Sequence, residues 1–333
     1  MRLATFNVEN LDQGSKARVD IAVRAAVLRP ALERLDADIV CLQEVNAQHV
    51  PGEEERRLLA LERLLEGTRY ADFHRAATSG RGGRALADVH NLVTLSRFPI
   101  LESREVHHHF VAPPLHTSIG AQPGGGEQTP IRFERPLLLT TIALPAAPPL
   151  FVVNVHLRAP LASPVAGQKS GPFAWRTVGG WAEGFYLSAL KREAQALELR
   201  LLVEEVLARD PAALLAVAGD FNAEDYGATL RIAVAAEEDL GTSELAARSL
   251  TVLDRALTAD RRWSVLHHGR PQMLDHILAS RALYGHFRGI EVHNEGLGDE
   301  ALGYGKALHS AASYHAPVVA VFEIDGAAAQ QKA

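Results

Sequence analysis

The stretch Ala216-Val217-Ala218-Gly219-Asp220-Phe221-Asn222-Ala223-Glu224-Asp225 is the most informative part of the sequence. The apolar run that leads into it, residues 212–218, is typical of a buried strand. If the strand continues, alternation points Asp220 and Asn222 to one side and Phe221 into the core. A carboxylate and an amide held together in this way can bind a water and a phosphate. The alternative is an ordinary strand-to-loop turn, since Gly, Asp and Asn are common turn residues.

The composition is that of an ordinary globular protein, with 47% hydrophobic and 22% charged residues in a chain of 333. The single cysteine, Cys41, lies in an apolar run and is expected in the core. No secretory leader is evident and no apolar stretch approaches the roughly 18 residues of a membrane span, which leads us to expect a cytoplasmic protein. The net charge of −6 argues against attraction of nucleic acid over the whole surface, although a local basic groove remains compatible with it.

Residues 1–326 are predicted to form one domain, followed by a flexible tail at 327–333. Apolar runs and alternating patterns predict strands at 2–8, 39–42, 91–96, 102–111, 136–144, 150–155, 212–218, 273–279, 287–292 and 316–324. Helical spacing of apolar residues predicts helices at 19–35, 53–65, 182–208 and 228–236. Residues 112–129 are rich in Gly and Pro, which indicates an exposed loop.

Polar residues of a narrow kind follow the predicted strands. Strands end on Asn7, Glu44, His156 and the pair Asp220 and Asn222, whereas Asp275 and His276 lie within a strand and His315 just precedes one. Strand ends gathered along one edge of a core would bring these carboxylates and imidazoles together. Such a set of groups suits a hard cation and a phosphate.

Seven short motifs occur in a characteristic order along the chain. They are Thr5-Phe6-Asn7-Val8, Leu42-Gln43-Glu44-Val45, Leu95-Ser96-Arg97-Phe98-Pro99, Asn154-Val155-His156-Leu157, Gly219-Asp220-Phe221-Asn222, Leu274-Asp275-His276-Ile277 and Ser313-Tyr314-His315-Ala316-Pro317. This ordered set resembles the endonuclease/exonuclease/phosphatase superfamily, which includes deoxyribonuclease I, abasic-site endonucleases, sphingomyelinases and inositol-polyphosphate 5-phosphatases. The resemblance covers residues 3–324.

The resemblance implies an α/β (α+β) fold like that of deoxyribonuclease I. In this four-layer sandwich, two mixed sheets lie face to face with helices outside. It also implies a divalent metal, usually Mg²⁺ with Mn²⁺ as the alternative, and cleavage of phosphoester bonds by water. Glu44 would be the main metal ligand with Asn7 beside it, since an anionic oxygen suits Mg²⁺. Asp220 would orient or deprotonate the attacking water, and Asn222 would hold water and phosphate in line.

The imidazoles receive roles by the same resemblance. His315 would bind the phosphoryl oxygens as a cation or transfer a proton, and Asp275 would fix its tautomer and raise its pKa. His156 would be a second phosphate donor or the acid for the leaving group. His276 is expected to support the site or pack in the core rather than contact the substrate.

One residue departs from the family pattern. The family usually has Asp immediately before the last His, where it helps to hold the metal, and here that residue is Tyr314. A protonated phenol is a poor Mg²⁺ ligand. Metal binding therefore relies on Glu44 and water, or another acid such as Asp299 or Glu300 reaches in, or the enzyme is weakened.

Candidate substrate-binding residues are basic or polar. Arg135 and Asn91 lie at predicted strand starts, and each could reach a phosphate or play no part in the site. The loop at 157–181 is basic and aromatic, without Asp or Glu, and its cations are Arg158, Lys169 and Arg176. Such a loop can hold a nucleic-acid backbone, gate a small phosphorylated molecule, or contact a lipid head group.

A cluster of imidazoles elsewhere in the chain raises the possibility of a zinc site. His107, His108 and His109 are consecutive, and His116 follows. Strand alternation would place consecutive side chains on opposite faces, so one site cannot collect all three.

The sequence therefore predicts a metal-dependent phosphoester hydrolase of the phosphodiesterase or nuclease type. The expected partner is a phosphate-ester substrate, which nucleic acid would satisfy, and no obligate protein partner is evident. Two alternatives stay open: an enzyme acting on a small or lipid-linked phosphate, and a catalytically weakened binding protein on the same fold.

Overall fold

The structure is a computed structural model that describes residues 1–14, 17–80, 85–124, 127–304 and 310–324. Two six-stranded sheets dominate it, and each is mixed. The expected tail at 327–333 lies outside the described residues.

The first sheet has the strand order β15-β16-β1-β2-β4-β3. Its only parallel pair is β1 with β2, and its other neighbours are antiparallel. The strands are β1 (Arg2–Leu11), β2 (Ile39–Val45), β3 (His74–Ala77), β4 (Asn91–Ser96), β15 (Phe287–Val292) and β16 (Val318–Phe322).

The second sheet has the order β11-β14-β10-β9-β8-β5, and its parallel pair is β9 with β10. Its strands are β5 (Ile100–Val106), β8 (Leu137–Ile142), β9 (Leu150–His156), β10 (Leu214–Asp220), β11 (Leu250–Val252) and β14 (Asp275–Ser280). In each sheet the parallel pair is central, which sets two pairs of carboxyl ends facing the same way.

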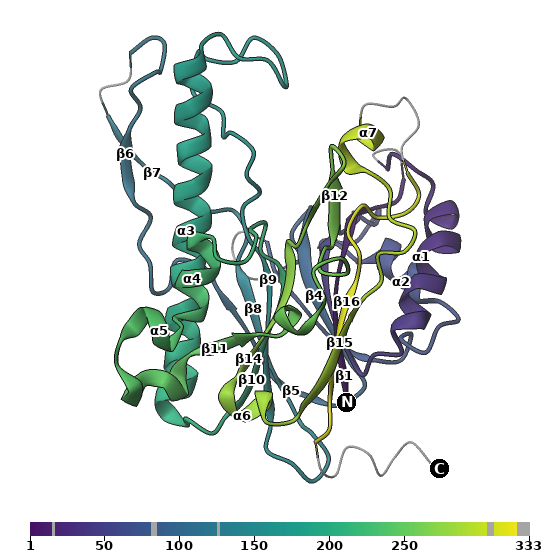
Figure 1. Cartoon of the computed structure of the whole chain (residues 1–333). Helices are drawn as coiled ribbons and strands as arrows, with labels where there is room; N and C mark the ends of the chain where they lie inside the picture. The colour runs from purple at the N-terminus through teal and green to yellow at the C-terminus, as the bar shows by residue number, and fades with distance from the viewer. Residues whose placement is uncertain (15–16, 81–84, 125–126, 305–309, 325–333) are drawn as a thin grey trace.

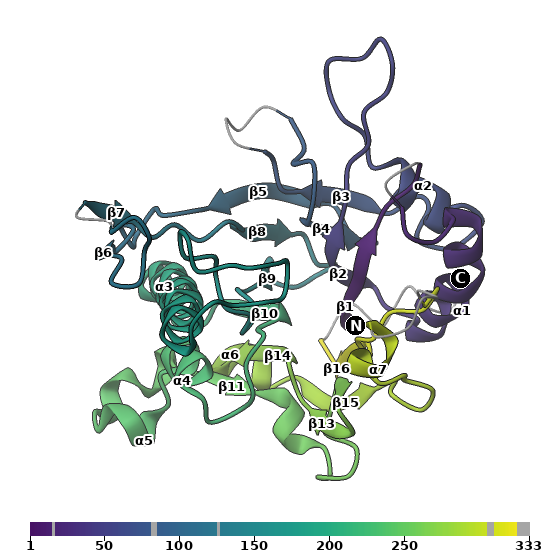
Figure 2. The same ribbon diagram turned by 90° about the horizontal axis from the view of Figure 1, so that it is seen from above.

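Helices cover the outer face of each sheet (Figures 1 and 2). On the first sheet these are α1 (Ile21–Leu35) and α2 (Leu59–Leu65), and on the second α3 (Val178–Arg209) and α4 (Ala228–Val234). Between the sheets, apolar side chains such as Ile39, Cys41 and Ala218 form a common core. Burial raises the pKa of the Cys41 thiol to about 12, so this cysteine is an inert core residue. The four-layer sandwich predicted from the sequence is confirmed.

Smaller elements complete the fold. They are the two-stranded sheets β6 (Leu115–Thr117) with β7 (Gln128–Pro130) and β12 (Val265–His267) with β13 (Arg270–Gln272), the helices α5 (Glu237–Leu240), α6 (Arg281–Tyr284) and α7 (Glu300–Tyr304), and the 3₁₀ turns Ser243–Arg248 and Leu253–Ala256. None of the helices in the described part of the chain combines the length and apolar character needed to cross a bilayer.

Two predicted elements are shorter than the sequence indicates. The helix expected at 53–65 begins only at Leu59, because Arg57 pairs with Gln48 in a β-bridge and the Gln48 side chain then accepts a hydrogen bond from the Ala60 N–H. The strand expected at 102–111 ends at Val106. Beyond it, Glu198 of α3 accepts hydrogen bonds from the N–H groups of residues 109–111.

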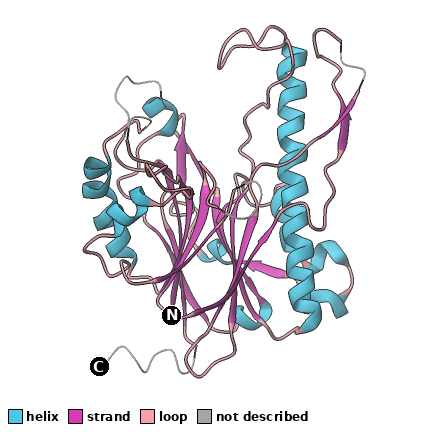
Figure 3. Ribbon diagram, turned by 180° about the vertical axis from the view of Figure 1, so that it is seen from behind, coloured by secondary structure: helices cyan, strands magenta, loops and turns pink. Residues whose placement is uncertain are grey.

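The expected loop at 112–129 contains the β6–β7 hairpin, which runs beside α3 (Figures 1 and 3). Helix α3 extends well above the sandwich, and Glu183 near its start accepts hydrogen bonds from the N–H groups of Ile119 and Gly120. Glu183 also contacts His116 at 2.9 Å. Two carboxylates on one helix thus hold the segment around 109–120 against it.

The Phe221 side chain packs into the core directly after the end of β10. Its ring is fully buried and meets the His276 ring edge-on at 5.5 Å, on the side of the sheet that faces α3. We expect Phe221→Ala to destabilise the protein by about 3–5 kcal/mol, because a cavity replaces a well-packed ring. Urea unfolding measures the change. Phe173→Ala is the matched control, since that ring is 96% exposed, and its change should stay within about 0.5 kcal/mol. Equal losses in the two variants would contradict this account.

Candidate active site

The carboxyl ends of the two parallel pairs meet above the core. Asn7 and Glu44 come from β1 and β2, whereas His156 and Asp220 come from β9 and β10. Regular pairing of β1 with β2 is interrupted between Asn7 and Leu11, and that of β2 with β4 between Leu42 and Val45. Such bulges re-aim side chains at a sheet edge.

A buried polar network joins the two sheets directly beneath these ends. Gln43 Nε2 donates to Asn154 Oδ1 at 2.8 Å, which links β2 to β9. Asn154 Nδ2 in turn donates to the carbonyls of Leu42 and Val93. Both side chains are fully buried, so their hydrogen bonds depend on one alignment of the two sheets.

The strand ends line a cavity of about 840 Å³. Catalytic candidates form one part of its wall, and other polar and apolar side chains form the rest. The described lining residues are Glu9, Asn10, Arg18, Glu44, His90, Arg135, His156, Ala159, Leu161, Phe173, Asp220, Asn222, His267, Glu300 and His315.

Asp220 is held by amides on two sides. Asn7 Nδ2 donates to Asp220 Oδ2 at 3.0 Å, and Asn222 donates to the same carboxylate through both its backbone N–H, at 2.8 Å, and its side chain, at 3.1 Å. Strand β10 ends at Asp220, and Asn222 reaches its neighbour through a turn with φ of 50°. Burial raises the pKa of Asp220 to about 7; His315 opposes this shift and Asp275 adds to it. Its carboxyl is therefore suited to exchange a proton near neutral pH.

His315 forms a dyad with Asp275. The two side chains are joined by a 2.8 Å bond between Nδ1 and Oδ2, and Ser264 Oγ donates to the same Asp275 oxygen at 2.7 Å. His315 Nε2 lies 3.9 Å from Asp220 Oδ2. Burial alone lowers the pKa of His315, but Asp275 and Asp220 outweigh it and raise the pKa well above its usual value. The ring is therefore an imidazolium near neutral pH.

His156 lies between two carboxylates but stays neutral. Its Nε2 is 3.4 Å from Asp220 Oδ2 and 3.6 Å from Glu44 Oε1. Burial lowers its pKa well below the usual value, and the Arg135 guanidinium lowers it further. The two histidines of the site thus differ in charge, because only His315 has a dedicated acidic partner.

Glu44 remains ionised at the cavity edge. Asn10 N–H donates to its Oε2 at 2.9 Å, and Asn7 Nδ2 lies 3.3 Å from its Oε1. Burial raises the pKa of Glu44, but interactions with His90, Arg135 and His315 outweigh it and lower the pKa overall. The oxygen of the Asn7 amide accepts a hydrogen bond from the Glu9 N–H, so in this structure Asn7 presents its nitrogen to both acids.

Arg135 lines the cavity with a partner that the sequence analysis missed. Its guanidinium donates to His90 Nδ1 at 2.8 Å and to the Leu157 carbonyl at 3.2 Å. Since an Arg only donates, His90 carries its proton on Nε2, which lies 2.9 Å from Asn10 Oδ1. His90 precedes a strand instead of ending one, and therefore gave no strand-end signal.

The backbone is unusual at this cavity. Five lining residues have φ between 49° and 62°, in the left-handed region that side chains other than Gly rarely adopt: Glu9, Asn10, Glu44, His90 and Asn222. Strain of this kind concentrates at functional sites. Only two of the five, Glu44 and Asn222, were singled out from the sequence.

A second group of charges supports the loop after β10. His276 bonds to Asp254 Oδ1 and to the Ala223 carbonyl, each at 2.9 Å, and is fully buried away from the cavity. Asp225 accepts from Arg255 and Arg262, and Arg262 also reaches Asp254. These contacts fix residues 220–225 from below.

The family model for the "Endonuclease/Exonuclease/phosphatase family" matches residues 4–315. The chain belongs to this family. No curated protein sequence matches it significantly. Solved structures are similar in fold: a family protein from Leptotrichia buccalis C-1013-b has 15% identity and a TM-score of 0.54 over 97% of this chain and 100% of that one.

Two further family folds are of comparable similarity. Truncated Caenorhabditis elegans TDP2 has 15% identity and a TM-score of 0.55, with 97% of each chain covered. An endonuclease/exonuclease/phosphatase from Beutenbergia cavernae DSM 12333 has 19% identity and a TM-score of 0.53, covering 96% of this chain and 70% of that one. At these identities the likeness concerns the fold.

Tyr314 stands where the resemblance led us to expect an acid. Its ring packs near Gly298, and its backbone N–H donates to Glu9 Oε2 at 3.0 Å. Of the acids considered as replacements, Glu300 lines the cavity, where its Oε2 lies 3.1 Å from His267 Nδ1. Asp299 accepts hydrogen bonds from the N–H groups of His268 and Gly269. Glu9 is a further cavity acid that the sequence analysis missed.

One group of side chains is close enough to share a metal ion among the residues that the structure describes. Ligand atoms of Asp220, Asp275 and His315 lie within 4.8 Å of one another. In this arrangement His315 Nδ1 already bonds to Asp275.

Several expected substrate residues lie away from the described cavity lining. Asn91 is fully buried, and its side chain bonds to the backbone of Val45 and Ala87. Arg158 borders a neighbouring hollow, and its Nε reaches Ser188 Oγ at 3.4 Å. Arg176 is exposed on the loop before α3.

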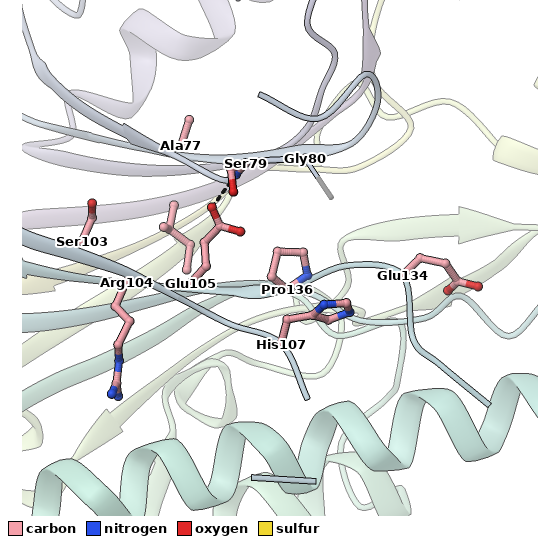
Figure 4. Close-up of a pocket in the computed structure, with 10 residues that line it drawn as sticks. Ala77, Ser79, Gly80, Ser103, Arg104, Glu105, His107, Glu134 and Pro136 are labelled. Carbon is pink, nitrogen blue, oxygen red and sulfur yellow. Dashed lines mark hydrogen bonds between the residues drawn. The ribbon is translucent and has the colours of Figure 1, made fainter. Parts of the chain in front are cut away.

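The histidines of the zinc hypothesis have separate partners. His107 and His108 bond to the carbonyls of Phe133 and Val111, and His116 to Glu183. Figure 4 shows His107 beside a separate cavity of about 410 Å³, where Glu105 accepts a hydrogen bond from Ser79 N–H. In the described ranges, none of these imidazoles joins a group of three potential metal ligands.

The ion pairs of Asp225 with Arg255 and Arg262 should contribute to stability in a pH-dependent way. Burial raises its pKa, but hydrogen bonds from Arg255 and Arg262 outweigh it and lower the pKa to about 2. Because the folded pKa lies below the unfolded one, Asp225 stabilises the protein above about pH 4, and this contribution is lost as pH falls toward 2. We expect Asp225→Asn to be less stable than wild type by roughly 1–3 kcal/mol at pH 7.

The difference should shrink as pH falls, measured by urea unfolding at pH 7, 5 and 3.5. Asp239→Asn is the control, since its partner Arg231 is exposed and such pairs contribute little. A difference that stays constant across this pH range would show that the Asp225 charge is not responsible.

Proposed function

We propose that the protein hydrolyses phosphodiesters with a divalent metal, Mg²⁺ being the expected ion and Mn²⁺ the alternative. The main support is Asp220, a buried carboxyl with a pKa near 7 that is held between two amides and faces an imidazolium. A group of this kind can accept a proton from water at neutral pH.

The donor set of the cavity fits a hard cation. Its lining acids are Glu9, Glu44, Asp220 and Glu300, and its cations are Arg18, Arg135 and the His315 imidazolium. Because the acids offset these cations, a bound divalent ion would strengthen the attraction of a phosphate. Glu44 is the best placed ligand, because its low pKa keeps it charged, and Glu9 and Glu300 are further oxygen donors on the same wall. A bound divalent ion would neutralise charge that builds on the phosphate and the leaving oxygen.

The residues of the chain then divide the remaining work. Asp220 takes a proton from water as the water oxygen bonds to phosphorus, and Asn7 and Asn222 keep the carboxylate in place. Arg135, fixed by His90 and the Leu157 carbonyl, directs its remaining N–H groups to a phosphate oxygen. The phosphorus–oxygen bond to the leaving group breaks on the side opposite the attacking water, and the leaving oxygen takes its proton from solvent. The His315 imidazolium, 3.9 Å from Asp220, donates a hydrogen bond to a phosphoryl oxygen. Asp275 holds His315 in the required orientation.

Asp220 is the first residue to test. With bis(4-nitrophenyl) phosphate as substrate, we expect turnover in Mg²⁺ or Mn²⁺ and none with chelator. Asp220→Asn should lower kcat by roughly 10²–10⁴-fold, because proton transfer is lost. The monoester 4-nitrophenyl phosphate should react more slowly, since its extra charge is unfavourable beside these acids. Absence of metal-dependent turnover on any phosphate ester would favour a binding protein, a role that the Tyr314 substitution allows.

Metal binding separates the two candidate positions without reference to activity. We expect Glu44→Gln to weaken Mn²⁺ binding by at least about tenfold, because it removes an anionic ligand. Asp275→Asn should change it by less than about threefold, since that acid serves His315. Isothermal titration and Mn²⁺ electron paramagnetic resonance measure both variants. The reverse pattern would move the metal to the cluster of Asp220, Asp275 and His315.

A further inference from the structure

The wall of the cavity formed by the segment before α3 is apolar. Ala159, Leu161 and Phe173 line it there, in the same cavity as the catalytic candidates. Leu161 is 69% exposed and Phe173 96% exposed, so neither side chain is committed to the core. Apolar side chains gathered on one wall, unlike single exposed ones, are typical of a binding site.

Two basic side chains of the same segment contact other parts of the protein. Lys169 Nζ lies 4.3 Å from the centre of the Trp175 ring, and Arg158 contacts Ser188 and the Leu161 carbonyl. Arg176 is not among the described lining residues. The part of the segment that faces the cavity is therefore apolar, although its sequence contains three cations.

The charge of the cavity also disfavours a polyanion. Four acids line it, Glu9, Glu44, Asp220 and Glu300, and they offset its three cations, Arg18, Arg135 and the His315 imidazolium. A nucleic-acid backbone needs a series of cations to neutralise successive phosphates. One phosphate beside one bound metal needs none of this.

We propose that the site takes a phosphodiester in which one ester group is apolar, with that group lying against Leu161 and Phe173. This inference rests on the proposed function and deepens it by naming the substrate class. The volume of about 840 Å³ lies within the range of pockets that enclose a small molecule, and the apolar wall and the acidic end share that space. The phosphate is held at the end formed by Asp220, Glu44 and Arg135, and the apolar group extends toward α3.

The test uses methyl, butyl and hexyl 4-nitrophenyl phosphates, which release the same chromophore and differ only in the alkyl group. Rates are measured with Mg²⁺ below the micelle concentration. We expect kcat/KM to rise by roughly two- to fourfold for each methylene that is buried. Leu161→Ala combined with Phe173→Ala should flatten this rise.

Ile119→Ala is the matched control. Ile119 is 90% exposed on the β6–β7 side, outside the described lining of the cavity, and its loss should leave the rise unchanged. A kcat/KM that is independent of alkyl length in wild type would overturn the inference while leaving phosphodiester hydrolysis intact.

A binding measurement separates this failure from failure of the proposed function. Isothermal titration of Asp220→Asn with methyl and hexyl phosphate in Mg²⁺ should show tighter binding of the hexyl compound even if no ester is hydrolysed. Equal affinity for the two would count against the apolar wall.

An oligonucleotide arm covers the competing substrate. A single-stranded 12-mer should inhibit hexyl ester hydrolysis weakly. Stronger inhibition by the 12-mer than by hexyl phosphate would favour a nuclease and overturn the inference. A nuclease would also be indicated if inhibition by the 12-mer depended on salt, and if this dependence were weaker in the triple variant Arg158→Ala, Lys169→Ala and Arg176→Ala.

Discussion

The hydrogen bond between Gln43 and Asn154 is the constraint on which the site depends. Both sheets contribute functional groups. The chemistry therefore requires that the two sheets pack against each other in one fixed alignment. Apolar contacts between Ile39, Cys41 and Ala218 are not directional and tolerate small shifts. A buried amide pair at 2.8 Å does not, because displacement would take away the hydrogen-bond donor of the buried Asn154 Oδ1. The Asn7 to Asp220 bond repeats this link one layer higher, at the cavity.

Much of the fold was accessible from the sequence, because the core strands are long apolar runs and α1 and α3 show clear helical spacing. The site was accessible for a related reason. Strand ends carry directional information, and Glu44, His156 and Asp220 do lie at or beside the ends of central strands. Asn7 lies within β1, at the point where its regular pairing with β2 stops. Asp220 and Asn222 illustrate how two interpretations combine: the strand stops at Asp220, and a turn, not alternation, returns Asn222 to its side.

The cavity residues that the sequence analysis missed are placed by backbone conformation and not by apolar spacing. Glu9, Asn10 and His90 reach the cavity through backbone in the left-handed region, which a pattern of apolar spacing does not encode. The basic loop before α3 was interpreted from its composition, whereas the direction of each side chain depends on Trp175 and Ser188 as tertiary partners. The β6–β7 hairpin was hidden for the same reason, since its strands are only three residues long and lie against α3.

The two acids of α3 that bind the segment around 109–120 also constrain the number of helical residues between them. Glu183 and Glu198 are 15 positions apart, which corresponds to about 22 Å along a helix and to about four turns. An insertion of one residue between them would rotate one carboxylate by about 100° relative to the other, so both could no longer meet their backbone amides. The number of residues between Glu183 and Glu198 is therefore constrained more strictly than their types. We expect relatives that keep the β6–β7 hairpin against α3 to differ there by substitution and not by insertion or deletion.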